Sequence, residues 1–182
     1  LLGLHPKAQA KVHRELDAIF GTDCNRPVTT GVLGRMRYLE CCLKETMRLY
    51  PPVPVIGRVL ERDQVIDDTR VPKGVTCFIN VFSLQRNPKY FKDPERFLPE
   101  RFMREESTFR CPFVYIPFSE GAGKCLGQTF AMMELKLLLA KIFSKFAVES
   151  IRPLDQVQTN FDDVVNARED LRFWIRRRQV HL

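Results

Sequence analysis

Apolar side chains recur at helical spacing near the start of the chain. Between residues 6 and 20 they fall three and four positions apart, at Ala8, Val12, Leu16 and Ile19. That spacing places them on one face of a helix. Pro6 suits the first turn of a helix, and Gly21 suits its end. The pattern therefore predicts a helix over 6–20 with one buried face.

A second helical pattern covers residues 38–50. One face carries Leu39, Cys42, Leu43, Thr46 and Leu49. Glu45 and Arg48 lie three residues apart on another face, where their side chains can pair. Read from the pattern alone, this is an exposed ion pair that contributes only about 0.2–0.5 kcal/mol. The prolines that follow, Pro51, Pro52 and Pro54, end the helix and favour extended backbone.

A third helical pattern covers residues 128–143. Its apolar positions at spacings of three and four are Phe130, Met133, Leu137 and Ala140. This pattern predicts a helix that buries the face on which these four side chains lie.

Short segments rich in β-branched and aromatic residues predict strands. They are 55–60, 65–66 paired with 70–71 in a small hairpin, 75–81, 147–151 and 171–177. Pro72 and Gly74 predict a turn over 71–74. The last strand alternates, which predicts one buried face made of Leu171, Phe173 and Ile175, with Trp174 on the other face.

The remaining segments predict loops. Residues 22–30 and 155–163 are polar, whereas 87–110 are interrupted by Pro88, Pro94 and Pro99. These prolines exclude a long helix, but Phe91, Phe97 and Phe102 are too apolar for a free linker. We therefore expect 87–110 to form a packed meander that something holds in place. The predicted fold class is mainly α with small β-sheets (α+β), in one domain over 1–182.

Composition narrows the functional classes. The chain has 182 residues, of which 45% are hydrophobic and 28% charged, as in an ordinary globular protein. It begins at Leu1 without an initiator Met, so we read it as a fragment whose membrane anchor, if it has one, lies upstream. The net charge of +7 is modest, and no helix carries a basic stripe with interleaved aromatic residues, so nucleic acid is not an expected partner. The arginines near the end predict a solvated edge, or a contact with an anionic membrane or an acidic redox partner.

Six cysteines are present, at positions 24, 41, 42, 77, 111 and 125. They form no Cys-x-x-Cys pair, and the histidines show no zinc-binding spacing. The expectation is that they are reduced, face the cytosol and are mostly buried.

Cys125 has an unusual setting. Gly121, Gly123 and Gly127 surround it, and the predicted helix over 128–143 follows. Three glycines this close imply a sharp turn, or a close approach to something large and flat. The unpaired N–H groups and the dipole at a helix start favour a thiolate, which is a soft metal ligand. The alternative is that Cys125 is a small buried hydrophobe, as most free cysteines are.

Three motifs occur in one order. They are Glu45-x-x-Arg48 on a helix that ends in Pro-Pro, Phe97-x-Pro99-Glu100-Arg101-Phe102 in the meander, and Phe118-x-x-Gly121-x-x-x-Cys125-x-Gly127 before the last long helix. In this order they resemble the C-terminal third of the cytochrome P450 superfamily. The stretches at 37–41, 44–48 and 117–119 look most like family 4, the fatty-acid hydroxylases.

The resemblance implies roles for particular residues. Cys125 would be the axial thiolate ligand of haem b iron, and therefore both the catalytic and the metal-binding residue. The other cofactor-binding residues would be Phe118, Gly121, Gly127, Lys124 and Arg58, the last two near a haem propionate. Glu45, Arg48 and Arg101 would form a buried structural triad behind the haem. Residues 53–57 and 164–167 would line the substrate cavity.

The resemblance also implies an activity for the full-length parent. It would be a haem-thiolate monooxygenase that inserts one oxygen atom from O₂ into a C–H bond of a fatty acid or similar apolar substrate. Its electron donor would be NADPH–cytochrome P450 reductase, and it would lie on the cytosolic face of the endoplasmic reticulum membrane. The oxygen-activating helix would precede Leu1, so the fragment alone is expected to be inactive. The alternatives are an O₂-independent haem-thiolate isomerase or dehydratase, and a degenerate haem-binding product.

The chain departs from the family pattern at Gly123, where the family places an Arg that pairs with a propionate. A charge-assisted bond of that kind contributes about 1.5–3 kcal/mol. We therefore expect Gly123 to weaken haem retention, with Lys124 as a point charge or Arg58 carrying the remaining load.

Overall fold

The computed structural model describes residues 1–21, 23, 26–103, 111–161 and 164–178. Its α-helices are α1 Pro6–Phe20, α2 Thr30–Arg35, α3 Arg37–Leu49, α4 Val81–Leu84 and α6 Gln128–Phe143. Short 3₁₀ segments are η1 Leu2–Leu4, η2 Pro99–Phe102, η3 Pro112–Val114, η4 Gly121–Gly123 and η5 Leu154–Gln156. The helices predicted over 6–20 and 128–143 are confirmed, and the one predicted over 38–50 is α3, shifted by one residue.

The described strands pair into two-stranded antiparallel sheets. The pairs are β1 Val55–Val59 with β4 Thr76–Asn80, β2 Gln64–Ile66 with β3 Thr69–Val71, β5 Phe146–Ser150 with β8 Phe173–Arg177, and β6 Thr159–Phe161 with β7 Val165–Ala167. The predicted hairpin is therefore β2–β3, and Gly74 takes the left-handed φ of 86° at the turn before β4. A mixed fold, mainly α with small sheets, is confirmed.

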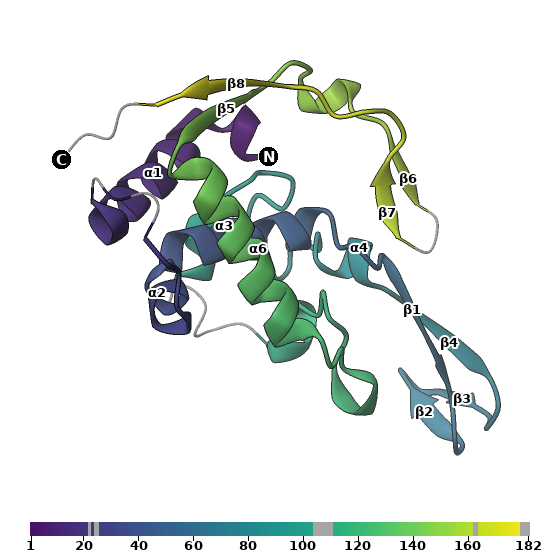
Figure 1. Cartoon of the computed structure of the whole chain (residues 1–182). Coiled ribbons are helices and arrows are strands. Elements are labelled where there is room, and N and C mark those ends of the chain that lie inside the picture. Colours follow the sequence, from purple (N-terminus) through teal and green to yellow (C-terminus); the bar gives the residue numbers. More distant parts are fainter. Residues whose placement is uncertain (22, 24–25, 104–110, 162–163, 179–182) are drawn as a thin grey trace.

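The helices surround one hydrophobic core. Helix α6 crosses α3 near the centre of the molecule, and both contact α1 (Figure 1). The buried core residues are Ala8, Val12, Leu16, Ile19, Phe20, Val32, Leu33, Met36, Leu39, Cys42, Leu49, Phe97, Ala140 and Phe143. Strands β5 and β8 run along the top of this body, whereas the β1–β4 and β2–β3 sheets extend away from it at the lower right (Figure 1). None of the helices in the described part of the chain is long and apolar enough to cross a membrane.

Two short α-helices and two short strands were missed from the sequence. Helix α2 starts where Thr29 accepts a hydrogen bond from the Val32 amide at 3.4 Å. Helix α4 starts where the Asn80 side chain accepts from the Ser83 amide at 2.9 Å, which ends the preceding strand earlier than predicted. Strands β6 and β7 lie partly in a segment predicted to be a polar loop. Elements of three to six residues are too short to show a hydrophobic period.

The buried face of α6 differs from the predicted one. The helix buries Lys136, Ala140 and Phe143, whereas Phe130 is 68% exposed and Leu137 is 40% exposed. The helix is apolar on nearly every side, so its periodicity does not select one face. The prediction for this face was therefore wrong for Phe130 and Leu137, and right for Ala140.

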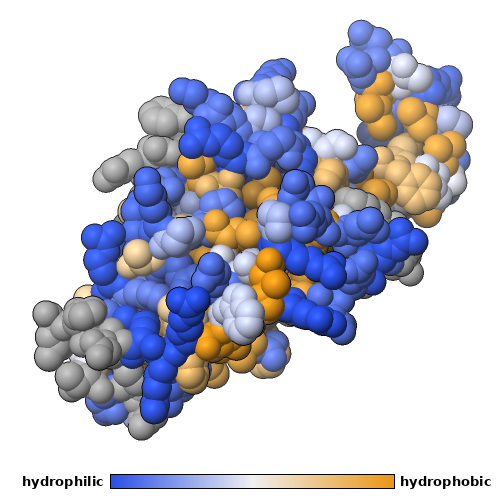
Figure 2. All heavy atoms as spheres, turned by 90° about the horizontal axis from the view of Figure 1, so that it is seen from above, coloured by the Kyte–Doolittle hydropathy of each residue, from blue (hydrophilic) through white to orange (hydrophobic). Residues whose placement is uncertain are grey.

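Strand β8 also departs from its prediction. Leu171, Phe173 and Ile175, which were expected to be buried, are 53%, 42% and 61% exposed. Figure 2 likewise shows hydrophobic atoms at the surface between hydrophilic ones, on the face seen from above. Phe173 and Ile175 share one side of the β5–β8 sheet, on which Val148, the partner of Ile175, packs against the core, but the β8 side chains themselves remain largely exposed.

The cysteines are less buried than expected. Cys41 and Cys42 are buried, Cys77 is half-buried, and Cys111 and Cys125 are exposed. All five are free thiols, and Cys24 lies outside the described residues. Burial raises the pKa of Cys41 to about 11, so this thiol stays protonated at neutral pH. The expectation of mostly buried cysteines was therefore wrong.

A buried lysine joins three helices. Lys136 of α6 is 6% exposed, and its Nζ donates to the Leu33 carbonyl at 3.1 Å and to Glu40 Oε2 at 2.5 Å. The other Glu40 oxygen lies 2.7 Å from Lys44 Nζ on α3. Burial alone would raise the pKa of Glu40, but the hydrogen bonds from Lys136 and Lys44 outweigh it and lower the pKa. The ionised carboxylate therefore holds α6 against α3 and the end of α2.

This arrangement predicts a pH-dependent contribution to stability. The folded pKa of Glu40 lies below its ordinary value of 4.5, so its contribution is present above that pH and is lost as pH falls through the folded pKa. In chemical denaturation of the full-length protein, Glu40→Gln should be less stable than the natural protein near neutral pH, and the gap should close in acid. Glu134→Gln, a change at an exposed glutamate of α6, should leave stability unchanged throughout. A gap for Glu40→Gln that stays constant with pH would contradict the ion-pair account.

Candidate functional site

The segment from Tyr115 to Cys125 forms a tight loop before α6. The Cys125 amide donates to the Phe118 carbonyl at 2.9 Å, and the Lys124 amide donates to the Gly121 carbonyl at 3.1 Å. Ser119 and Gly121 take left-handed φ values of 63° and 75°, which closes the turn. These contacts fix the backbone on both sides of the cysteine.

Cys125 presents its thiol at the surface of this loop. It is exposed, two residues ahead of Gly127, which precedes the first residue of α6. A methyl group at Gly127 would lie 3.8 Å from the Cys125 sulfur, so this position is close to the thiol. Leu126 is fully exposed and Phe130 is 68% exposed. A thiol beside large uncovered apolar side chains does not match a buried structural cysteine.

Two cations lie at the loop. Arg58 of β1 is half-buried, and its Nη2 donates to Ser119 Oγ at 2.5 Å and to the Gly123 carbonyl at 3.4 Å. The Lys124 ammonium instead lies 3.2 Å from Glu120 Oε1, in a half-exposed pair. The structure therefore brings Arg58 from a distant strand onto the loop that carries Cys125.

Glu45 and Arg48 form a buried pair, not an exposed one. Both side chains are 0% exposed, and Arg48 Nε donates to Glu45 Oε2 at 2.8 Å. Arg101 is also buried, and its Nε donates to Glu45 Oε1 at 3.0 Å. The exposed-pair interpretation was wrong because α3 is buried on nearly all sides. The three residues named by the resemblance meet in one charged cluster.

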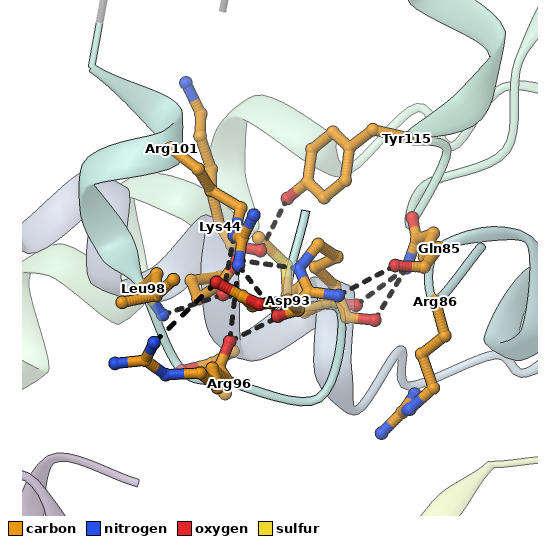
Figure 3. Close-up of polar contacts among 12 residues, drawn as sticks. Lys44, Gln85, Arg86, Asp93, Arg96, Leu98, Arg101 and Tyr115 are labelled. Atoms are coloured by element: carbon orange, nitrogen blue, oxygen red, sulfur yellow. Dashed lines mark hydrogen bonds and ion pairs between the residues drawn. The ribbon is translucent and has the colours of Figure 1, made fainter. Parts of the chain in front are cut away.

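This charged cluster holds the meander in place through hydrogen bonds to the backbone of the meander. The Leu98 amide donates to Glu45 Oε1 at 2.9 Å. Arg101 donates to the carbonyls of Lys92 at 2.9 Å and Asp93 at 3.2 Å. In Figure 3 Leu98, Arg96 and Arg101 gather at the same cluster. Backbone groups that cannot pair with one another in an irregular segment are thus satisfied by three charged side chains.

Sequence reasoning missed Gln85, which extends the cluster to the Cys125 loop. Gln85 is fully buried and accepts a hydrogen bond from the Ile116 amide at 3.0 Å. Its side-chain amide nitrogen, Nε2, donates to the Met47 carbonyl at 3.0 Å, and its backbone carbonyl accepts from Arg48 Nη1 at 2.8 Å. Gln85 follows a four-residue helix, and no pattern in so short a segment marks it as buried. It links α3 to the start of the loop (Figure 3).

A second contact between α3 and the loop comes from Tyr115. Its hydroxyl donates to the Lys44 carbonyl at 3.0 Å. Burial raises the pKa of Tyr115 well above its ordinary value, so the hydroxyl remains a donor across the physiological range. A cavity of about 460 Å³ borders this part of the loop, with Tyr115, Phe118 and Lys136 in its lining. Cys125 is not among its described lining residues, so the cavity and the thiol are separate features.

The two segments expected to line a substrate cavity lie side by side. The Val165 amide donates to the Pro52 carbonyl at 2.8 Å, which joins β7 to the residues before β1. Val165 and Ala167 line an apolar cavity of about 220 Å³ with other residues that include Leu154, Leu171 and Phe173. Val53 and Val55 are 42% and 44% exposed. Their role in substrate binding stays a prediction.

These features suit a flat, largely apolar group with acidic edges and a soft metal, such as the haem that the resemblance implies. The exposed thiol can bind a metal that accepts sulfur ligands, the Arg58 guanidinium can donate hydrogen bonds to a carboxylate, and Leu126 and Phe130 offer uncovered apolar surface. The residues present therefore fit the group.

Comparison with known proteins gives matches over most of the chain. The family model described as cytochrome P450 matches residues 1–172. Cytochrome P450 4V2 of Mus musculus is 41% identical over 181 residues, which is 100% of this chain and 34% of that protein. Cytochrome P450 4c3 of Drosophila melanogaster is 40% identical over 172 residues, which is 94% of this chain and 32% of that protein. The chain thus spans about a third of the length of these curated relatives.

The buried cluster generates a stability prediction. Glu45→Ala leaves Arg48 and Arg101 buried without their carboxylate, which costs about 3–5 kcal/mol of unfolding free energy. The full-length variant should therefore yield little folded protein, as measured by soluble yield and urea denaturation.

The matched control is Glu149→Ala, which breaks an exposed pair with Arg176 at 3.6 Å. That change should alter the free energy of unfolding by about 1 kcal/mol or less. If the two variants were equally stable, the buried cluster would not hold the meander.

Proposed function

The chain belongs to the cytochrome P450 family, and from that premise we propose that the protein carrying it is a haem-thiolate monooxygenase. When bound, haem supplies an iron centre at which O₂ is activated for insertion of one oxygen atom into a C–H bond. The observation that supports this role most directly is the exposed Cys125 residue, which lies on a loop fixed by the hydrogen bond from its own amide to the Phe118 carbonyl.

In this proposal Cys125 would hold the haem iron through its sulfur and would therefore be the catalytic residue. Phe118 is half-buried and fixes the Cys125 backbone, so it sets the direction of the sulfur. Gly121 supplies the left-handed turn with φ of 75°, and Gly127 lies beside the sulfur, which a methyl group there would contact at 3.8 Å.

Arg58 and Lys124 are proposed to neutralise the carboxylates of the cofactor. Arg58 Nε donates to no acceptor among the described residues, so this edge of its guanidinium is available to a carboxylate. Lys124 can contribute only by leaving Glu120, because its Nζ lies 3.2 Å from that carboxylate. Arg58 is therefore the stronger candidate.

Glu45, Arg48 and Arg101 are proposed to be structural and silent in the chemistry. Within the described residues they hydrogen-bond to one another, to backbone groups of the meander and to the Gln85 carbonyl, and Gln85 in turn contacts the loop at the Ile116 amide. Their task is to fix the backbone from which Cys125 is presented.

The proposed substrate is a fatty acid or a similar apolar molecule. This rests on the resemblance to family 4 and on the apolar lining at Val165, Ala167 and Phe173. The proposed partner is NADPH–cytochrome P450 reductase, and the proposed location is the cytosolic face of the endoplasmic reticulum membrane, reached through an anchor upstream of Leu1.

One observation favours a second candidate, a haem-binding product without catalytic activity. Gly123 stands where the family has an arginine, so one expected carboxylate partner is missing from the loop. An intact carbon monoxide spectrum without substrate turnover would favour this candidate over the monooxygenase.

The ligand assignment predicts a spectroscopic result. The full-length protein, reduced and treated with carbon monoxide, should show the spectrum of thiolate-ligated haem. Cys125→Ser should abolish that spectrum because the hydroxyl is a much poorer ligand for the metal. Cys111→Ser, at another exposed cysteine, should retain it. A Cys125→Ser protein that keeps the spectrum would reject the assignment.

The substrate proposal predicts turnover of long-chain acids. Full-length protein, reductase and NADPH should oxidise saturated fatty acids near the methyl end, as detected by mass spectrometry of the products. Protein carrying Cys125→Ser should give no product under the same conditions. Turnover confined to unrelated substrates would reject the fatty-acid class while leaving the haem assignment intact.

A further inference from the structure

Gly123 lies against the end of the Arg58 side chain. A methyl group at Gly123 would lie 2.5 Å from Arg58 Nη2 and 2.8 Å from its Cζ. Real side chains do not approach so closely, so any residue larger than glycine would push the guanidinium out of its place. The glycines with left-handed φ are Gly21, Gly74 and Gly121, so backbone conformation does not demand glycine at 123. What glycine provides at 123 is room.

Arg58 uses that room to join a strand to the Cys125 loop. Its Nη1 donates to the Gly57 carbonyl of its own strand at 2.9 Å. Its Nη2 donates to Ser119 Oγ at 2.5 Å and to the Gly123 carbonyl at 3.4 Å. Ser119 holds a left-handed φ of 63°, which a serine adopts only when its surroundings stabilise it. The guanidinium therefore bridges the first and last turns of the loop that precedes Cys125.

We propose that Gly123 and Arg58 work as one unit: the glycine forms the seat for the guanidinium, and Arg58 is the positioning residue that fixes the Cys125 loop. This inference rests on the proposed haem site. It reverses the expectation that Gly123 weakens haem retention, because in this chain the arginine that steadies the loop comes from β1 and needs the space that a loop side chain would fill.

The proposal predicts whether Gly123→Ala strengthens or weakens haem retention. Gly123→Ala at an ordinary φ should stabilise a protein slightly, because alanine reduces the freedom of the unfolded chain. With Arg58 seated against Gly123, the added methyl group instead displaces the guanidinium from Ser119 and loosens the loop. The same substitution therefore improves or worsens haem retention according to whether the Arg58 contact matters.

A double-mutant cycle on full-length, haem-loaded protein tests the coupling. The variants are Gly123→Ala, Arg58→Gln and the combination, and the readout is the rate of haem transfer to apomyoglobin. Each single change should speed haem loss on the order of tenfold, the effect of losing one hydrogen bond to a charged group. The combined variant should lose haem no faster than Arg58→Gln alone, since the methyl group then has no guanidinium to displace.

Two controls separate the coupling from general effects. Gly34→Ala adds a methyl group that would meet no described neighbour within 4 Å outside its own helix, and it should leave haem loss unchanged. Arg62→Gln removes an exposed arginine that follows β1, and it should also have no effect. If Arg58→Gln fails to load haem, Ser119→Ala replaces it in the cycle. It removes in advance the Arg58–Ser119 bond that Gly123→Ala is proposed to break, so the combined variant should again lose haem no faster than Ser119→Ala alone.

The outcomes distinguish this inference from the proposed function. The inference would be overturned if Gly123→Ala lost haem as slowly as the natural protein. It would also be overturned if the increase in the rate of haem loss in the combined variant equalled the product of the increases in the two single variants. Either result would leave the haem site standing if Cys125→Ser still abolishes the thiolate spectrum. A Cys125→Ser protein that keeps that spectrum would overturn both.

Discussion

The hydrogen bonds to the buried carboxylate of Glu45 are the interactions on which the position of the Cys125 loop depends. This carboxylate accepts hydrogen bonds from Arg48 and Arg101 and from the Leu98 amide, so one side chain ties α3 to an irregular segment. Removing two cations and a carboxylate from water is costly, and the cluster is favourable only because nearly every donor finds an acceptor. The meander has little regular structure of its own, so its position follows from this cluster.

The same cluster reaches the thiol. Arg48 donates to the Gln85 carbonyl, and the Gln85 side chain accepts from the Ile116 amide, at the start of the loop that carries Cys125. The far end of the loop is held differently, by Arg58 from β1. If Cys125 is the iron ligand, as proposed, its position is preorganised, because the two ends of its loop are anchored to separate elements.

The sequence predicted the parts of the fold in which apolar residues recur over many positions. The bounds of α1 and α6 followed from apolar spacing, and the order of three short motifs indicated the family. It could not predict which face of α6 is buried, because that helix is apolar on nearly every side. The buried position of Gln85 and the packing of Arg58 against Gly123 could not be predicted either, because each depends on residues that are far apart in the sequence.

The central claim is that Cys125 binds haem iron from a loop anchored by Gln85 at one end and Arg58 at the other. A crystal structure of the full-length, haem-loaded protein, with iron located by anomalous scattering, tests it most directly. The account predicts iron within bonding distance of the Cys125 sulfur, with Arg58 still seated between Ser119 and Gly123. Iron bound to any other side chain of this protein, with Cys125 turned away from it, would contradict the account.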